Sequence, residues 1–341
     1  MRFNPDYTPN PERAVFIHGP IDQALVHRLT PDILLLQSQG RDPITAYIDS
    51  PGGNVTCATQ LRALLQAPDQ SGVRCRLLTV VTSIAASAAA DLLMIGDYAL
   101  AYPESIIHFH GTRYVWERDF TQQDATGFAQ SLRAANESAA ADLLACAEER
   151  FVFRYLSSTN PTSLDSTVTA VLAKVSKATS EIVLTAHRKA LSFQELVAQL
   201  ADKKGSEAQL LRTLITREFK QNGPRPSEYE LHSVVEKFLW LRFYLEMISG
   251  LGNRKAYQRW LDYFPSLDKL SDEDLAAFKD DALNDLADLW FFFMALCHTL
   301  QEGENPLPAS DALHLGLIDE VIGLPNTPNL RLLVEYPRDP Q

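Results

Sequence analysis

Cysteine is scarce in this sequence, and no two cysteines stand at a spacing that would bind a metal ion or form a redox pair. Four occur in 341 residues, and each lies in an apolar stretch without a Cys-x-x-Cys partner. This usage argues against a disulfide framework and favours reduced, buried thiols in a cytoplasmic protein. The four positions are Cys57, Cys75, Cys146 and Cys297.

Long apolar runs and clusters of basic residues are also missing. The longest apolar run, near 286–300, holds Asp288 and extends over about 15 residues, short of the ~20 that span a bilayer. The first residues have no apolar core, so we expect no secretory signal. The formal net charge is −12, whereas binding to phosphate backbones needs clustered Lys and Arg. We therefore expect neither a membrane nor a nucleic acid as partner.

The first half of the chain alternates strand-like and helix-like segments. The run at 76–84 is apolar throughout, as expected for a strand buried on both faces of a parallel sheet. The alternation predicts βαβ units and the α/β fold class. The expected strands are 14–19, 44–50 and 76–84, and the expected helices are 24–40, 57–68 and 86–97.

The second half changes to helical patterns. From about 121 to 300 nearly every segment has helical spacing. The motifs Ser192-x-x-Glu195 and Ser227-x-x-Glu230 are capping boxes, which predict helix starts. Mixed α/β character returns near the end. The predicted organisation is an α/β core with a long helix over 1–156, a helical insertion over 157–285, and a return to the core over 286–341.

Three expected strand ends carry residues that could do chemistry. The strand ending at Ser50 continues into Pro51-Gly52-Gly53, and paired glycines let backbone N–H groups approach a cleft, as an oxyanion hole requires. Ser87 begins the helix after the next buried strand, where a helix N-terminus favours negative charge. A third strand carries His108 and His110 on one face. A serine hydroxyl needs an adjacent base of this kind to act as a nucleophile.

Each of these residues also has an ordinary structural interpretation. Gly-Gly after a strand is a common turn, Ser87 can simply cap a helix, and single histidines are often satisfied core groups. His108 and His110 could hold a metal ion from one strand face, but no neighbouring acid or cysteine in the sequence completes a ligand set. We expect neither a metal ion nor another cofactor.

The order and spacing of these motifs resemble the proteolytic subunit of the Clp protease family. The similarity falls in two blocks, one on each side of the predicted insertion. The Ser-Pro-Gly-Gly piece becomes specific when Ala-Ala-Ser and then His follow at the right interval. The matching segments are VFIHGPID at 15–22, YIDSPGGNVT at 47–56, AASAAADLL at 85–93, YPESIIHFHG at 102–111 and ASDALHLGLIDEVI at 309–322.

The resemblance implies a ClpP/crotonase-like α/β fold of repeated ββα layers and the activity of a serine peptidase. The family's nucleophile falls on Ser87, and its general base falls on His110. The oxyanion hole would be the backbone N–H groups of Gly53 and Ala88, with Gly52 beside them. The family's self-association into rings implies a homo-oligomer, and its substrates are peptides or unfolded proteins.

The resemblance also implies a third catalytic residue, an acid beside the nucleophile and the base. It is found by counting back within the closing segment, the last matching stretch of the chain and the residues just before it. The family has an Asp twelve positions before a Gly, and twelve positions before Gly316 stands Glu304. A carboxylate there could orient the imidazole, as in other Ser-His-Asp/Glu sites, or it could be an exposed loop acid. Asp311 and Asp319 are the alternatives, better suited to structural roles. His108 falls where the family usually has an apolar residue, so it is the lesser candidate base.

Departures from the family pattern keep two other interpretations open. The N-terminus lacks the longer segment that faces an ATPase in the family, so an ATPase partner stays uncertain. The chain could be a catalytically degenerate Clp-like scaffold whose helical insertion binds a partner protein. It could also be a crotonase-like acyl-CoA enzyme, although the Ser–His spacing argues against that.

Overall fold

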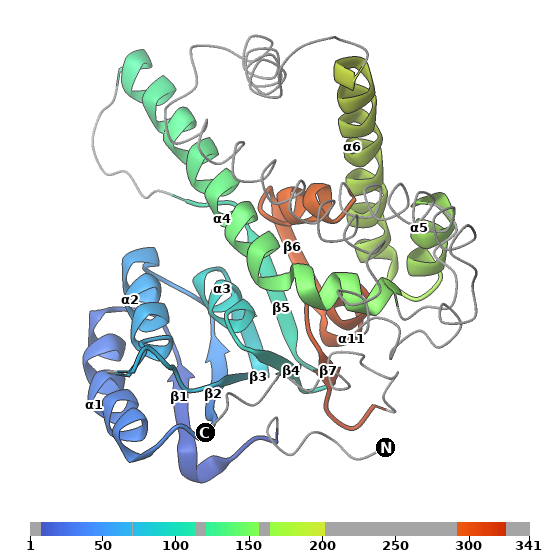
Figure 1. Cartoon of the computed structure of the whole chain (residues 1–341). Coiled ribbons are helices and arrows are strands. Elements are labelled where there is room, and N and C mark those ends of the chain that lie inside the picture. The colour runs from blue at the N-terminus through green and yellow to red at the C-terminus, as the bar shows by residue number, and fades with distance from the viewer. Residues whose placement is uncertain (1–7, 70, 114–120, 157–163, 202–291, 325–341) are drawn as a thin grey trace.

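A computed structural model describes residues 8–69, 71–113, 121–156, 164–201 and 292–324 (Figure 1). These residues form a seven-stranded sheet with helices packed on it, which confirms the α/β class. Five strands run in parallel in the order β1-β2-β3-β4-β7. Outside this order, β5 pairs with β3, and β6 pairs with β5. The strands are β1 (Ala14–His18), β2 (Ile44–Ser50), β3 (Leu77–Ala86), β4 (Tyr98–Ala101), β5 (Ile106–His110), β6 (Glu304–Pro308) and β7 (Glu320–Val321).

Strand β3 joins the two parts of the sheet because it is long enough to pair with two strands along one edge. Its residues 78–81 pair in parallel with β4, and residues 84–86 pair in parallel with β5. Strand β6 then pairs antiparallel with β5. Along its other edge β3 pairs with β2 up to Ser50. The carboxyl end of β3 therefore lies between the ends of β2 and β5.

Helices α1, α2 and α3 cover one face of the sheet, and N-cap side chains stabilise the first turns of two of them. Asp22 accepts a hydrogen bond from the Leu25 N–H at 2.8 Å at the start of α1, and Asn54 accepts one from the Cys57 N–H at 3.1 Å at the start of α2. Residues 292–300 are also helical. The named helices are α1 (Gln23–Gln39), α2 (Val55–Leu65), α3 (Ala88–Met94), α4 (Gln122–Leu156), α5 (Leu164–Leu172), α6 (Lys177–Ala201) and α11 (Ala309–His314), after a 3-10 turn at Pro11–Arg13.

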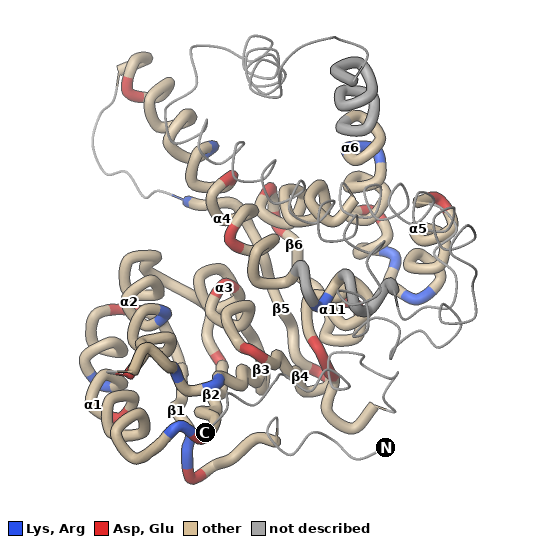
Figure 2. Tube along the Cα trace, viewed as in Figure 1, with Lys and Arg blue, Asp and Glu red and all other residues tan. Residues whose placement is uncertain are grey.

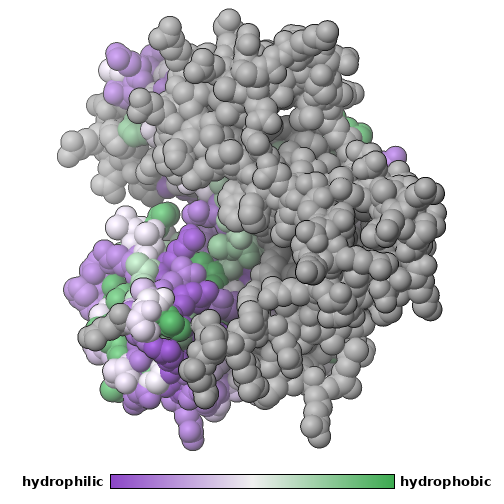
Figure 3. All heavy atoms as spheres, viewed as in Figure 1, coloured by the Kyte–Doolittle hydropathy of each residue, from purple (hydrophilic) through white to green (hydrophobic). Residues whose placement is uncertain are grey.

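Side chains alternate along β1 as the period of a strand requires. Val15 and Ile17 are buried in the core with the helices, whereas Phe16 faces outward, 57% exposed, and stacks on Tyr47 with ring centroids 5.3 Å apart. On the described surface near α1 and α2, apolar residues are scattered among hydrophilic ones (Figure 3). Acidic and basic residues both occur along the described helices (Figure 2). Within the described residues, no helix combines the length and apolarity needed to cross a bilayer.

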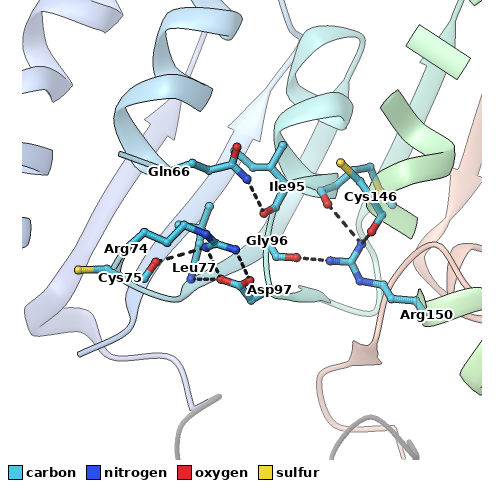
Figure 4. A network of polar contacts seen from close by, with 10 residues as sticks. Gln66, Arg74, Cys75, Leu77, Ile95, Gly96, Asp97, Cys146 and Arg150 are labelled. Carbon is cyan, nitrogen blue, oxygen red and sulfur yellow. Dashed lines mark hydrogen bonds and ion pairs between the residues drawn. The ribbon is translucent and has the colours of Figure 1, made fainter. Parts of the chain in front are cut away.

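The turn between α3 and β4 is held by a polar network that joins it to the start of β3 and to α4 (Figure 4). Arg74 binds Asp97 through two hydrogen bonds of 2.7 and 2.6 Å, and the same carboxylate accepts the N–H of Leu77 at 2.7 Å. Arg150 of α4 donates to the Gly96 carbonyl. Because this network fixes the end of α3, it also fixes the direction of the helix whose first turn follows Ser87.

The closing segment returns to the sheet on both sides of its short helix, with β6 beside β5 and β7 beside β4. Arg150 reaches this segment as well, because its Nε lies 2.9 Å from Asp319 Oδ2 in an ion pair whose side chains are 2% and 1% exposed. Asp319 also accepts the Ala99 N–H at 2.8 Å. A buried ion pair thus ties α4, which lies before the predicted insertion, to residues that lie after it.

The described part of the predicted insertion, residues 164–201, holds α5 and α6. Asp311 of α11 joins α6 to the core, since its Oδ2 accepts the hydroxyls of Ser176 and Thr179 at 2.6 Å each. The helix start predicted at Ser192 is wrong. Ser192 lies inside α6, and its hydroxyl donates to the Arg188 carbonyl at 3.2 Å, a bond that a serine within a helix can make to the preceding turn.

Most of the predicted insertion lies outside the described residues, including Ser227-x-x-Glu230 and everything between 202 and 285. The domain boundaries at 156/157 and 285/286 therefore stay predictions.

Candidate active site

Ser87 stands in the turn between β3 and α3 with φ 55° and ψ −129°. It is the one residue other than glycine with a positive φ in the described part of the chain. A side chain disfavours this conformation by about 1–3 kcal/mol, and such strain persists only where neighbouring contacts impose it. Here the Ser87 N–H donates to the His108 carbonyl at 2.8 Å, and Ala86 pairs with His108 across β3 and β5. The pairing of two strands therefore fixes the backbone that presents the Ser87 hydroxyl.

The Gly-Gly turn after β2 packs directly against Ser87. A Cβ on Gly52 would lie 2.4 Å from the Ala86 carbonyl oxygen, 2.7 Å from Ser87 Cβ and 3.2 Å from the Ala88 nitrogen. The turn is anchored to Ile21, whose N–H donates to the Gly52 carbonyl at 2.8 Å. The structure thus brings Ser87, Ala88 and Gly52 into contact, with Gly53 next along the chain. The oxyanion hole made of the Gly53 and Ala88 N–H groups stays a prediction.

Replacing Gly52 by alanine tests this close approach. We expect Gly52→Ala to lower the rate at which Ser87 reacts with a fluorophosphonate about 100-fold, because the new methyl group must push the Ser87 turn away from its partners. Gly72→Ala is the matched control, since Gly72 has φ +81° against +87° for Gly52 and nothing lies within 4 Å of its Cβ position. Both variants place a Cβ at a similar positive φ, so equal rates for the two would contradict the proposed crowding at Ser87.

His110 ends β5 and is half-buried. Its Nδ1 lies 2.7 Å from the Gly111 carbonyl oxygen. A carbonyl can only accept, so Nδ1 carries the hydrogen and Nε2 of the neutral ring is the basic nitrogen. The structure records no hydrogen bond between the Ser87 hydroxyl and the His110 ring, both of which are described. The two residues are brought to neighbouring strand ends, but their side chains are not hydrogen-bonded in this conformation.

Glu304 begins β6, directly opposite His110 in the antiparallel register. Its polar contacts are with other groups: Oε2 lies 3.1 Å from His108 Nε2, and Oε1 accepts a hydrogen bond from Arg113. Desolvation alone would raise the pKa of Glu304, but the hydrogen bond and charge of Arg113, with smaller contributions from His110 and His108, hold that pKa below its usual value. Glu304 is therefore an ionised carboxylate at neutral pH, placed beside both histidines.

Sequence reasoning ranked His108 low and missed Arg113. The alternation of β5 placed His108 on the face of His110, and the structure puts their rings at a centroid distance of 5.6 Å, edge to face. No sequence signal marks Arg113, whose contact with Glu304 spans 191 residues. Among the described residues, no group of three or more His, Cys, Asp or Glu side chains could hold a metal ion.

Asp311 and Asp319, the alternative third members, have structural contacts. Asp311 accepts the hydroxyls of Ser176 and Thr179, and Asp319 is buried against Arg150. Both carboxylates are occupied by partners outside the candidate site, and the role of Glu304 as the third member stays a prediction.

Comparison with known proteins finds similar sequences for the first part of this chain. Residues 9–139 match the family model of the Clp protease. The segment is 31% identical over 101 residues to ATP-dependent Clp protease proteolytic subunit 1 of Streptomyces coelicolor, an alignment that covers 28% of this chain and 44% of the relative. It is 36% identical over 102 residues to proteolytic subunit 2 of Leifsonia xyli subsp. xyli, covering 29% and 44%.

A similar solved structure is the ClpP1 N165D mutant from Listeria monocytogenes, with 21% identity, a TM-score of 0.34, and coverage of 40% of this chain and 72% of that one. The chain spans less than half the length of the curated relatives it matches. The resemblance to the Clp protease family is confirmed for residues 9–139, which include Ser87 and His110. Glu304 lies outside the matched segment.

Proposed function

We propose that this protein is a serine peptidase of the Clp protease type, which cleaves peptide bonds through an acyl-enzyme on Ser87. The observation that carries the proposal is the placement of Ser87, held in a strained turn at the start of α3, against a Gly-Gly turn and beside a strand that bears His110. Strained conformations of this kind are typical of functional sites. The family match over this segment supports the same chemistry.

The roles follow from the chemistry of each group. Ser87 Oγ attacks the peptide carbonyl while His110 Nε2 takes its proton, and His110 then gives that proton to the leaving amine. The N–H groups of Gly53 and Ala88 donate to the oxyanion that forms. Water then hydrolyses the ester on Ser87, with His110 again as the base. The negative charge of Glu304 stabilises the His110 imidazolium during both steps.

The substrates and the assembly are part of the proposal. The names of the curated relatives describe proteolytic subunits of an ATP-dependent protease. We accordingly propose peptides or unfolded proteins as substrates and a homo-oligomer as the working form. The proposal does not include docking of an ATPase.

A second candidate function has two observations in its favour. The Ser87 hydroxyl and the His110 ring share no hydrogen bond, and the carboxylate of Glu304 is paired with His108. That arrangement suits a degenerate Clp-like scaffold that binds a partner through its helical segment. Covalent chemistry at Ser87 separates the two functions.

The test is labelling of the wild-type protein with a fluorophosphonate, followed by mass spectrometry of the labelled peptide. The peptidase proposal expects one phosphonyl group per chain on the peptide that contains Ser87. No label, or a label that maps to another serine such as the exposed Ser83 of the same strand, would favour the scaffold.

A further inference from the structure

His108 and His110 lie on one face of β5, and Phe109 between them is buried in the core. The register places His110 opposite Glu304 on β6 and His108 opposite Pro306. The two imidazoles and the carboxylate therefore share one side of a two-stranded unit. Nothing in the proposed peptidase reaction uses His108, although it is the ring that Glu304 contacts.

Two nitrogen-bearing side chains approach the Glu304 carboxylate, one at each oxygen. His108 Nε2 lies 3.1 Å from Oε2, and Arg113 donates to Oε1. Glu304 itself is 56% exposed, so without these partners its side chain would sample several rotamers. His108 Nε2 is shielded from solvent, and the structure records no hydrogen bond to it, which leaves the Glu304 carboxylate as its polar neighbour.

His110 receives its orientation from a different group. Its Nδ1 donates to the Gly111 carbonyl, not to a carboxylate. A backbone carbonyl can fix the tautomer and the ring plane, but it carries no net charge to stabilise an imidazolium. The negatively charged group opposite His110 across the strand pair is Glu304. Its effect on His110 depends on where the carboxylate is held, because Coulomb energy falls with distance.

We propose that His108 is a positioning residue for the peptidase reaction: it holds the Glu304 carboxylate opposite His110, so that its charge stabilises His110 when His110 carries the Ser87 proton. The inference rests on the proposed function. In this proposal Glu304 belongs to the active site because His108 holds it there. The Clp resemblance does not predict this histidine, since the family usually has an apolar residue at this position. Among the described residues, His108 lies against the His110 ring and the Glu304 carboxylate, and Arg113 binds the other oxygen of that carboxylate.

The experiment compares four proteins by their reaction with a fluorescent fluorophosphonate: wild type, His108→Leu, His108→Gln and Glu304→Gln. The end-point stoichiometry counts folded sites, and the second-order rate constant reports activation of Ser87. We expect His108→Leu to keep full stoichiometry and to react about tenfold more slowly, because the Glu304 carboxylate loses one of its two close polar contacts. His108→Gln should stay within about twofold of wild type, because its amide N–H can still hold the carboxylate.

The double variant His108→Leu with Glu304→Gln tests whether the two residues act together. If His108 acts through Glu304, the double variant reacts no more slowly than Glu304→Gln alone. Additive losses, or a His108→Leu rate equal to or above that of wild type, would overturn the positioning role while leaving the peptidase proposal intact. A wild-type protein that is not labelled at Ser87 would overturn both.

Discussion

Ser87→Ala is expected to lower kcat for a cleaved fluorogenic peptide by at least about 10⁴-fold, because members of a catalytic triad act as a unit. Alanine keeps the Cβ and therefore the crowded contact with Gly52, so the loss reports the hydroxyl and not a rearranged turn. KM should change little, since the hydroxyl contributes to the reaction step more than to substrate binding. Steady-state kinetics of the full chain gives both values.

Two further variants sharpen this test. Ser83→Ala, an exposed serine on the same strand, should retain wild-type activity. Ser87→Gly should be as inactive as Ser87→Ala but about 1 kcal/mol more stable, because glycine adopts φ 55° and ψ −129° without the strain that a Cβ imposes. Substantial activity in Ser87→Ala would end the case for a nucleophile here. A Ser87→Gly variant no more stable than Ser87→Ala would contradict the strained turn.

The features of the site that are local in sequence could be predicted from it. Runs of β-branched and apolar residues identified the strands that end before Gly52 and Ser87, because a parallel strand buried on both faces needs such a run. The helix beginning after Ser87 follows from its alanines and leucines. Alternation placed both histidines on one face of β5, and the structure agrees. Each of these inferences depends on residues within about one turn or strand of each other.

Contacts between distant segments could not be predicted in the same way. The Clp resemblance implied Glu304 as the third member by its spacing from Gly316, and that role stays a prediction, although the register of β5 and β6 puts Glu304 opposite His110. The choice of His108 as the partner depends on a side-chain rotamer and on Arg113, which no spacing rule encodes. The helix start predicted at Ser192 was wrong for a related reason. The capping-box motif is local, but residues 177–201 form one continuous helix that includes it.

The ion pair between Arg150 and Asp319 yields the largest expected effect on stability. We expect Arg150→Leu to lower the free energy of unfolding by about 3–5 kcal/mol, because it leaves the Asp319 carboxylate charged, 1% exposed and without its cation. The same guanidinium also donates to the carbonyls of Cys146 and Gly96. Urea unfolding monitored by circular dichroism measures the loss. Because Gly96 follows α3, we also expect the fluorophosphonate reaction at Ser87 to slow in the folded variant.

The exposed pair of Arg41 and Asp69 is the matched control, with a nitrogen–oxygen distance of 2.7 Å and side chains 60% and 38% exposed. Arg41→Ala should cost less than about 1 kcal/mol, since solvent screens a surface pair. Adding Asp319→Asn to Arg150→Leu removes the stranded charge and keeps an acceptor for the Ala99 N–H, so the double variant should recover part of the loss. If the Arg150 and Arg41 variants lost equal stability, burial would not explain the contribution of the Arg150–Asp319 pair to the free energy of unfolding. The link between α4 and the closing segment would then have to come from packing, such as that of Phe151 against Gly316.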